Sequence, residues 1–234
     1  MELLARLAED PERAAIFLDV DGVLAPIVPR PKDARVPEEI RTELRRLAAR
    51  YALVACVSGR AGDDARAVVG VDELTFVGNH GLEREPNAAE WAARLAAFLA
   101  DVNWPRTEDK GLTASLHYRE MDEVASRQKL DDVAARARAQ GFMARYGRKV
   151  LELLPPLEAN KGTAVRGLLA EHHLRRALYA GDDTTDLDAF SALDGLEVAV
   201  RVAVASPEGP AELRERADIV LDAQTNVLDV LRAL

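Results

Sequence analysis

The feature that most constrains the fold is a short apolar run that ends in two closely spaced aspartates. Residues 14–18 are wholly apolar, and Asp19 and Asp21 follow them directly. A continuous apolar run of this length predicts a strand buried on both faces, as in a parallel sheet. Open α/β sheets bind ligands at the carboxyl ends of their strands. Asp19 and Asp21 are therefore the first candidate active-site residues, and other site residues are expected at the same edge.

Apolar runs and amphipathic stretches alternate before residue 84 and after residue 157. Strands are predicted at residues 14–18, 53–57, 74–77, 177–180, 196–200 and 218–221. Helices are predicted near the N-terminus and at residues 38–50, 63–69, 161–171, 185–193, 207–216 and around 227–231. This alternation predicts an α/β fold with a Rossmann-like, doubly wound parallel sheet.

The pattern changes between these two parts of the chain. Helices are predicted at residues 87–102 and 122–140, and strands at 112–118, 142–146 and 150–154. Neighbouring strands without a helix between them indicate antiparallel pairing. We therefore predict a catalytic core of residues 1–83 and 158–234, with an inserted α+β cap at residues 84–157.

A second acidic cluster follows the predicted strand at 177–180. It contains Asp182, Asp183 and Asp186. Either acidic motif alone is also compatible with a solvated loop or a helix cap. If the two motifs adjoin, several carboxylates share one small space, and protons or a cation must offset their repulsion. Oxygen ligands without a nearby cysteine favour a hard ion. Mg²⁺ is the hard ion that keeps bound waters while it contacts phosphates.

Two further segments offer groups that could bind a phosphate. Ser58 and Gly59 follow the predicted strand at 53–57, although a Ser-Gly pair by itself is usually a turn. Lys161 follows Asn160, a candidate helix N-cap. A lysine in the first turn of a helix opposes the helix dipole unless an anion lies between them. Lys161 is therefore either a phosphate ligand or an exposed surface residue.

Composition limits the classes of partner. The 234 residues carry a formal net charge of −9, which argues against nucleic acid or an anionic membrane as the main partner. The single cysteine, Cys56, lies in an apolar run, so no disulfide framework is expected and a reducing compartment is indicated. The first residues do not resemble a signal peptide, and no stretch has the length of a membrane span. We expect a cytoplasmic protein with a small-molecule substrate.

Taken in order, the two acidic motifs, Ser58 and Lys161 resemble the motifs of the haloacid dehalogenase superfamily of phosphotransferases. The resemblance implies that Asp19 is the nucleophile that attacks phosphorus, and that Asp21 is the general acid and then the general base. It also implies a further set of ligands. Mg²⁺ would be held by Asp19, Asp182 and the backbone carbonyl of Asp21, with Asp183 and Asp186 in support, and phosphoryl oxygens by Ser58, Gly59 and Lys161.

Within that superfamily the chain most resembles the trehalose-6-phosphate phosphatases. The resemblance rests on GNHGLE from Gly78, SLHYR from Ser115, GRKVLELLPPLEANKG from Gly147 and GDDTTDLDAF from Gly181. It implies hydrolysis of trehalose 6-phosphate, with release of trehalose and phosphate, through an aspartyl-phosphate intermediate.

The cap segments supply three candidate sugar ligands. Glu152 has apolar neighbours along its strand and needs a partner, or else lies on a solvated edge. Arg148 lies on the same face about 13 Å away, a separation that suits residues on either side of a sugar. The resemblance assigns both to binding of glucose hydroxyls. Arg119 is either a further ligand or a cap-packing residue, and His80 is expected to fix the loop that leads into the cap.

Several alternatives remain open at this point. The family usually has a basic residue where Leu154 stands, so phosphatases acting on mannosyl-3-phosphoglycerate, sucrose phosphate or glucosylglycerol phosphate are competing interpretations. A phosphomutase is disfavoured, because the predicted insert lies between Ser58 and Lys161 and not between Asp21 and Ser58. A non-catalytic sugar-phosphate binder is disfavoured by the intact pair of Asp19 and Asp21.

Overall fold

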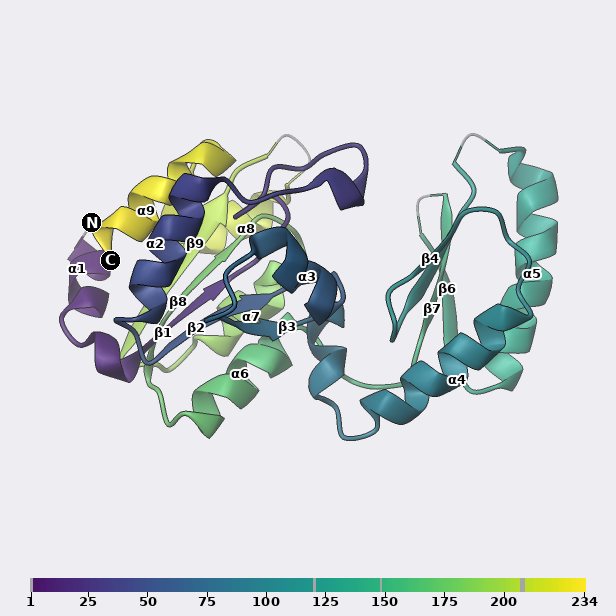
Figure 1. Ribbon diagram of the computed structural model, residues 1–234, viewed down its shortest axis with the longest axis horizontal. Helices are drawn as coiled ribbons and strands as arrows, with labels where there is room; N and C mark the ends of the chain where they lie inside the picture. The colour runs from purple at the N-terminus through teal and green to yellow at the C-terminus, as the bar shows by residue number, and fades with distance from the viewer. Residues whose placement is uncertain (1, 120, 148, 207–208) are drawn as a thin grey trace. The chain divides into compact units, whose positions relative to one another are not determined.

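The computed structural model describes residues 2–119, 121–147, 149–206 and 209–234 (Figure 1). The chain forms two compact units. The sheet unit comprises Met1–Gly81 and Ala159–Leu234, and the cap unit comprises Leu82–Glu158.

The sheet unit contains a six-stranded parallel sheet in the order β10-β9-β8-β1-β2-β3. Its strands are β1 (Ala14–Leu18), β2 (Leu53–Val57), β3 (Thr75–Val77), β8 (Arg176–Gly181), β9 (Val198–Val204) and β10 (Ile219–Leu221). The chain runs outward from β1 to β3 and then resumes with β8 on the other side of β1. The strand order therefore reverses between β1 and β8, and such a reversal is where open α/β sheets bind their ligands.

Helices cover both faces of this sheet. The first face packs against α1 (Glu2–Ala8), α2 (Glu38–Ala48), α3 (Gly62–Val69) and α9 (Val227–Ala233). The second packs against α6 (Lys161–Glu171), α7 (Asp186–Ala192) and α8 (Ala211–Arg216). Ile16 and Leu18 enter the first core, and Ala15 and Phe17 enter the second, because successive residues of a strand point to opposite faces. The predicted doubly wound sheet is confirmed.

The cap unit contains a four-stranded antiparallel sheet in the order β4-β5-β7-β6. Its elements are α4 (Ala88–Ala100), β4 (Thr107–Asp109), β5 (Ala114–His117), α5 (Glu123–Ala139), β6 (Met143–Gly147) and β7 (Val150–Leu154). Leu95 of α4 and Leu130 of α5 share a core with Leu116 and Leu151 of the sheet. The two helices thus pack on one face, and the α+β character predicted for the insert is confirmed. Short 3₁₀ segments lie at Pro11–Arg13, Pro31–Asp33, Asn79–Arg84 and Gln224–Asn226.

The sequence-based prediction was wrong for one strand and shifted for another. Strand β4 was not predicted, because Thr107–Asp109 is short, polar and at the edge of its sheet. Strand β9 was predicted to end at Val200, but it continues through Arg201 to Val204. The Arg201 guanidinium pairs with Asp194 at 2.6 Å and with Asp218 at 3.5 Å, so its charge does not stop the strand. The predicted start of α8 at Pro207 lies outside the described residues.

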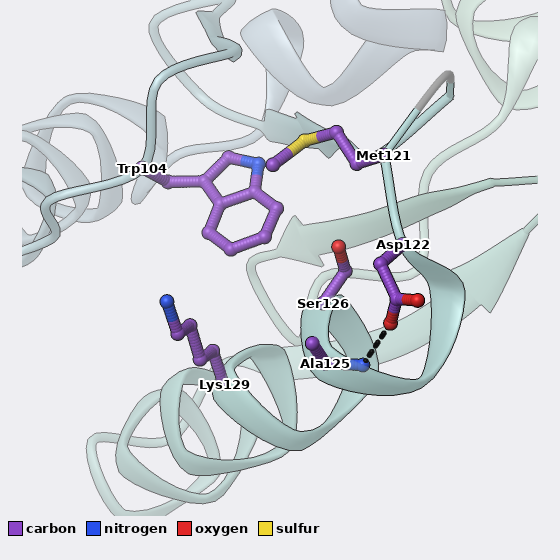
Figure 2. A pocket seen from close by; sticks show the side chains of 6 residues that line it. All are labelled: Trp104, Met121, Asp122, Ala125, Ser126 and Lys129. Carbon is purple, nitrogen blue, oxygen red and sulfur yellow. Dashed lines mark hydrogen bonds between the residues drawn. The ribbon is translucent and has the colours of Figure 1, made fainter.

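The cap unit also has a cavity of about 150 Å³ (Figure 2). Its lining residues are Trp104, Met121, Asp122, Ala125, Ser126 and Lys129. Asp122 caps α5 there, since its Oδ1 accepts a hydrogen bond from the Ala125 amide at 2.7 Å. None of the predicted site residues that the structure describes lines this cavity. Among the helices of the described ranges, none combines the length and the apolar character that a bilayer crossing requires.

Candidate active site

Three neighbouring strands each end in a predicted site residue. Asp19 follows β1, Ser58 follows β2 and Asp182 follows β8. Leu18, the last residue of β1, pairs with Cys56 on one side and with Ala180 on the other. The Asp19 amide continues the ladder with a 3.0 Å hydrogen bond to the Ala180 carbonyl. The carboxyl ends of these strands therefore bring the two acidic motifs together at the point where the strand order reverses.

The two acidic motifs share one buried cluster. Carboxylate oxygens of Asp19, Asp182 and Asp186 all lie within 4.8 Å of one another, and all three residues are buried. Gly22 makes this approach possible. A Cβ atom on Gly22 would lie 2.1 Å from Oδ2 of Asp182, and the φ angle of Gly22 is +78°. Both values exclude a side chain at this position.

Lys161 is the cation of the cluster. Its side chain is 2% exposed, and Nζ donates to Oδ2 of Asp19 at 2.5 Å and to Oδ1 of Asp186 at 2.7 Å. Lys161 is the first residue of α6 because Asn160 caps that helix. The Asn160 side chain accepts from the Thr163 amide, and the Thr163 hydroxyl accepts from the Asn160 amide. This capping box fixes the start of the helix and so directs the ammonium into the cluster.

Asp186 is held by four donors. Oδ1 accepts from Lys161 Nζ at 2.7 Å and from the Tyr179 hydroxyl at 2.6 Å. Oδ2 accepts from the amides of Asp182 and Asp183, both at 2.9 Å. These bonds fix the loop that carries Asp182. With both oxygens occupied in this way, Asp186 is suited to support a metal ligand more than to be one.

Burial changes the protonation of the cluster. It raises the pKa of Asp19 to about 7, with Asp186 adding repulsion and Lys161 opposing the change. Burial, together with the charges of Asp19 and Asp186, raises the pKa of Asp182 to about 8. Burial disfavours the ammonium of Lys161, but the two carboxylates outweigh it, so the pKa of Lys161 lies above its ordinary value. The cluster therefore has more negative charge than Lys161 offsets, and its oxygen-only donors fit a hard divalent cation.

The structure does not bring the carboxylates of Asp21 and Asp183 into this cluster. Asp21 instead forms two hydrogen bonds with Arg60, at 2.6 and 2.7 Å. The hydrogen bonds that Arg60 donates to Asp21 and Asp64 raise the pKa of its guanidinium, although burial opposes this change. Asp183 is exposed, and it contacts Asp186 through its backbone: its amide donates to Oδ2 of Asp186 at 2.9 Å, and its carbonyl accepts from the Asp186 amide at 3.0 Å. The motifs did not reveal Arg60, whose only signal was its place directly after Ser58 and Gly59.

The predicted phosphate loop packs against the segment that leads out of the sheet unit. Ser58 is 1% exposed, and its amide donates to the Val77 carbonyl at 3.0 Å. A Cβ atom on Gly59 would lie 2.7 Å from the His80 ring. Asn79 and His80 both have positive φ angles, 50° and 54°. These contacts place His80 beside the phosphate loop, in keeping with the expectation that it fixes the neighbouring loop.

Two of the three candidate residues of the cap, Glu152 and Arg119, lie among the described residues. Glu152 lies on the sheet face opposite the helices and pairs with Arg145 of β6, with 2.9 Å between Nε and Oε2. Arg119 is exposed, and its carbonyl accepts from Arg106. Arg148, the third candidate, lies outside the described residues. The partner that Glu152 needs is Arg145, directly opposite in the ladder, and the sequence did not reveal this cross-strand register.

Comparison with known proteins gives consistent matches. The family model described as trehalose-phosphatase matches residues 17–107 and 98–217. A trehalose-phosphate phosphatase of Mycobacterium avium is 35% identical over 208 residues, which cover 77% of this chain and 51% of that protein. A trehalose 6-phosphate phosphatase of Zea mays is 30% identical over 248 residues, covering 87% of this chain and 68% of the relative. The chain thus spans about half the length of the mycobacterial relative.

A solved structure shares the fold. The C-terminal domain of a Candida albicans trehalose-6-phosphate phosphatase superposes with a TM-score of 0.68 at 20% identity, covering 98% of this chain and 95% of that one. At this identity the likeness concerns the fold alone. The family model and the maize relative extend over most of the chain. The chain therefore belongs to the trehalose-phosphatase family.

Proposed function

We propose that the chain is a Mg²⁺-dependent phosphatase that hydrolyses trehalose 6-phosphate to trehalose and inorganic phosphate. The observation that carries this proposal is the contact between buried Lys161 and Asp19 at the end of β1, beside Asp182. A carboxylate can approach a phosphate dianion only where cations offset the repulsion. Family membership supports the choice of sugar phosphate, since both relatives described above are named for it.

In the proposed reaction Asp19 is the nucleophile. An oxygen of Asp19 bonds to phosphorus, the bond from phosphorus to the sugar oxygen breaks, and Asp21 gives its proton to that oxygen. Asp21 then takes a proton from water as the water attacks phosphorus, and the bond from phosphorus to the Asp19 oxygen breaks. Ser58, Gly59 and Lys161 bind phosphoryl oxygens. This assignment leaves trehalose, phosphate and the carboxylate of Asp19 as products, so atoms and charge balance.

Mg²⁺ would be held by Asp19, Asp182 and the carbonyl of Asp21, with Asp186 fixing the loop of Asp182. When bound, the ion supplies positive charge that offsets the phosphate and the carboxylates. The cluster fits this role because its donors are all oxygens and because burial, together with repulsion among the carboxylates, raises the pKa values of Asp19 and Asp182. Asp183, whose side chain is exposed, would support the ion only from outside the buried cluster.

The cap unit is proposed to select the sugar. Glu152 would accept hydrogen bonds from glucose hydroxyls, and Arg119 and Arg148 would donate to them. Leu154, where the family usually has a basic residue, removes one donor from the same sheet face.

We further propose a cytoplasmic location, which the single buried cysteine, Cys56, supports.

The test is phosphate release from a panel of sugar phosphates, with and without Mg²⁺. The panel contains trehalose 6-phosphate, sucrose phosphate, glucosylglycerol phosphate and mannosyl-3-phosphoglycerate. We expect the highest kcat/KM for trehalose 6-phosphate, and loss of activity when a chelator removes Mg²⁺. The Asp19→Asn variant should keep its fold, because Asn retains the side-chain oxygen that accepts from the Val20 amide, and should show no turnover. A higher kcat/KM for another member of the panel would contradict the proposed substrate.

A further inference from the structure

Arg60, which follows the predicted phosphate loop, makes a two-pronged ion pair with Asp21. Its Nε donates to Oδ2 of Asp21 at 2.6 Å, and its Nη2 donates to Oδ1 at 2.7 Å. The Arg60 side chain is 9% exposed, whereas that of Asp21 is 40% exposed. Parallel N–H···O bonds of this kind fix the plane of a carboxylate as well as its distance. The pair therefore holds the Asp21 carboxylate in one orientation.

The guanidinium of Arg60 is also held by groups other than Asp21. Its Nη1 donates to Oδ2 of Asp64 on α3 at 2.7 Å, and Nη2 donates to the Pro31 carbonyl at 3.0 Å. Its backbone amide donates to the Ser58 hydroxyl at 3.2 Å, which ties it to the phosphate loop. Arg60 therefore stays in position if Asp21 gives up one of its two bonds during proton exchange. The Asp64 carboxylate still balances the charge of the guanidinium.

We infer that Arg60 is a positioning residue for Asp21, and that it sets the orientation from which Asp21 protonates the leaving sugar oxygen. This inference rests on the proposed function. In that reaction the breaking bond leaves its electron pair on the sugar oxygen, and the proton must arrive there as the charge develops. Arg60 acts on this step through Asp21, and its effect should depend on how much the leaving group needs a proton.

The test compares two leaving groups. A sugar alcohol leaves poorly without a proton, whereas 4-nitrophenol leaves readily as its anion, and kcat/KM covers only the steps up to departure of the alcohol. Arg60→Ala should lower kcat/KM for trehalose 6-phosphate about 100-fold, and for 4-nitrophenyl phosphate less than about three-fold. Arg60→Lys keeps the charge without the planar fork, so it should recover only part of the loss.

A matched control and a double variant identify the route of the effect. Arg66 lies on α3, six residues after Arg60, and pairs with Asp72 at 3.6 Å. Its side chain is 43% exposed, so Arg66→Ala should leave both activities unchanged. In the Asp21→Asn background, Arg60→Ala should cause no further loss. Equal losses on the two substrates, no loss on either, or a further loss in the Asp21→Asn background would each overturn the inference.

A second measurement does not depend on turnover. If the pair holds in solution, Arg60→Ala lowers the Tm by several degrees in the wild-type background and by less in the Asp21→Asn background. The same change in both backgrounds would overturn the inference. A wild-type chain that hydrolyses neither substrate contradicts the proposed function and the role of Arg60 with it. An active wild type whose Arg60 variants behave normally contradicts the inference alone.

Discussion

At the scale of single residues, Asp186 shows how the site is fixed before any substrate binds. Its two oxygens accept hydrogen bonds from a lysine, a tyrosine and two backbone amides, and the residue is fully buried. Buried polar groups of this kind are costly only when a partner is missing. The cost of removing Asp186 therefore comes from the donors that it would leave behind, above all Lys161 and Tyr179.

The hydrogen bonds to Asp186 predict a graded series of variants. Asp186→Ala should lower the free energy of unfolding by about 3–5 kcal/mol, because it leaves buried donors without an acceptor. Relief of repulsion with Asp19 and Asp182 works in the opposite direction but does not replace those bonds. Tyr179→Phe removes one hydrogen bond and should lower the free energy of unfolding by about 1 kcal/mol. Urea unfolding measures both values, and an Asp186→Ala variant as stable as wild type would contradict the network.

At the scale of helices and strands, close packing between α6 and α7 depends on Gly162. A Cβ atom at this position would lie 2.3 Å from the Asp188 carbonyl, and the residue is buried. Helix propensity alone predicts that Gly→Ala stabilises a helix by about 1 kcal/mol. The contact with the Asp188 backbone predicts instead that Gly162→Ala destabilises the protein. Neither α6 nor α7 can move away without displacing Lys161 or the acidic loop.

We therefore expect Gly162→Ala to destabilise the protein and to lower kcat as well. The matched variant is Ala170→Gly, at an exposed position of the same helix, where loss of propensity alone should cost about 1 kcal/mol. Chemical unfolding of the two variants separates the two effects. A stabilised Gly162→Ala protein would show that α6 and α7 have room to adjust.

Elements that carry a local signal of their own could be predicted from the sequence. Strands β1, β2 and β7 and helix α6 lie at the predicted residues, because apolar runs and the Asn160 cap are local features. Asp19 and Asp182 could be placed together because parallel strands end at one sheet edge. Arg145 opposite Glu152, and Arg60 on Asp21, could not be predicted, since both depend on which side chains face each other across separate elements.

At the scale of the whole molecule, the acidic balance makes the site dependent on cations. The chain has a formal net charge of −9, and three buried carboxylates share the ammonium of Lys161. Long-range attraction of an anionic substrate is therefore not expected from the overall charge. Local positive charge must come from Lys161 and from a bound divalent ion, so stability and activity should respond to that ion together.

This coupling predicts that Mg²⁺ stabilises the protein more at pH 8 than at pH 5.5. Folding raises the pKa of Asp19 from 3.8 to about 7 and that of Asp182 from 3.8 to about 8. A carboxyl group whose pKa is raised by folding contributes its full stability below its unfolded pKa and loses it as the pH rises through its folded pKa. Without a divalent ion, these two groups should therefore lower the Tm between pH 5.5 and pH 8.

Mg²⁺ should reverse that loss, because the ion competes with protons for the same oxygens and binds best when both groups are ionised. At a concentration of about 100 times its Kd, the ion stabilises the folded state by roughly 2.7 kcal/mol, which corresponds to a Tm rise of roughly 5–10 °C for the sheet unit. Thermal unfolding at the two pH values, with and without Mg²⁺, measures the effect. Asp182→Asn is the matched variant. It removes one ionisable ligand and should flatten both the pH dependence and the response to Mg²⁺, whereas equal Tm shifts at pH 5.5 and pH 8 would show that the buried aspartates do not bind the ion.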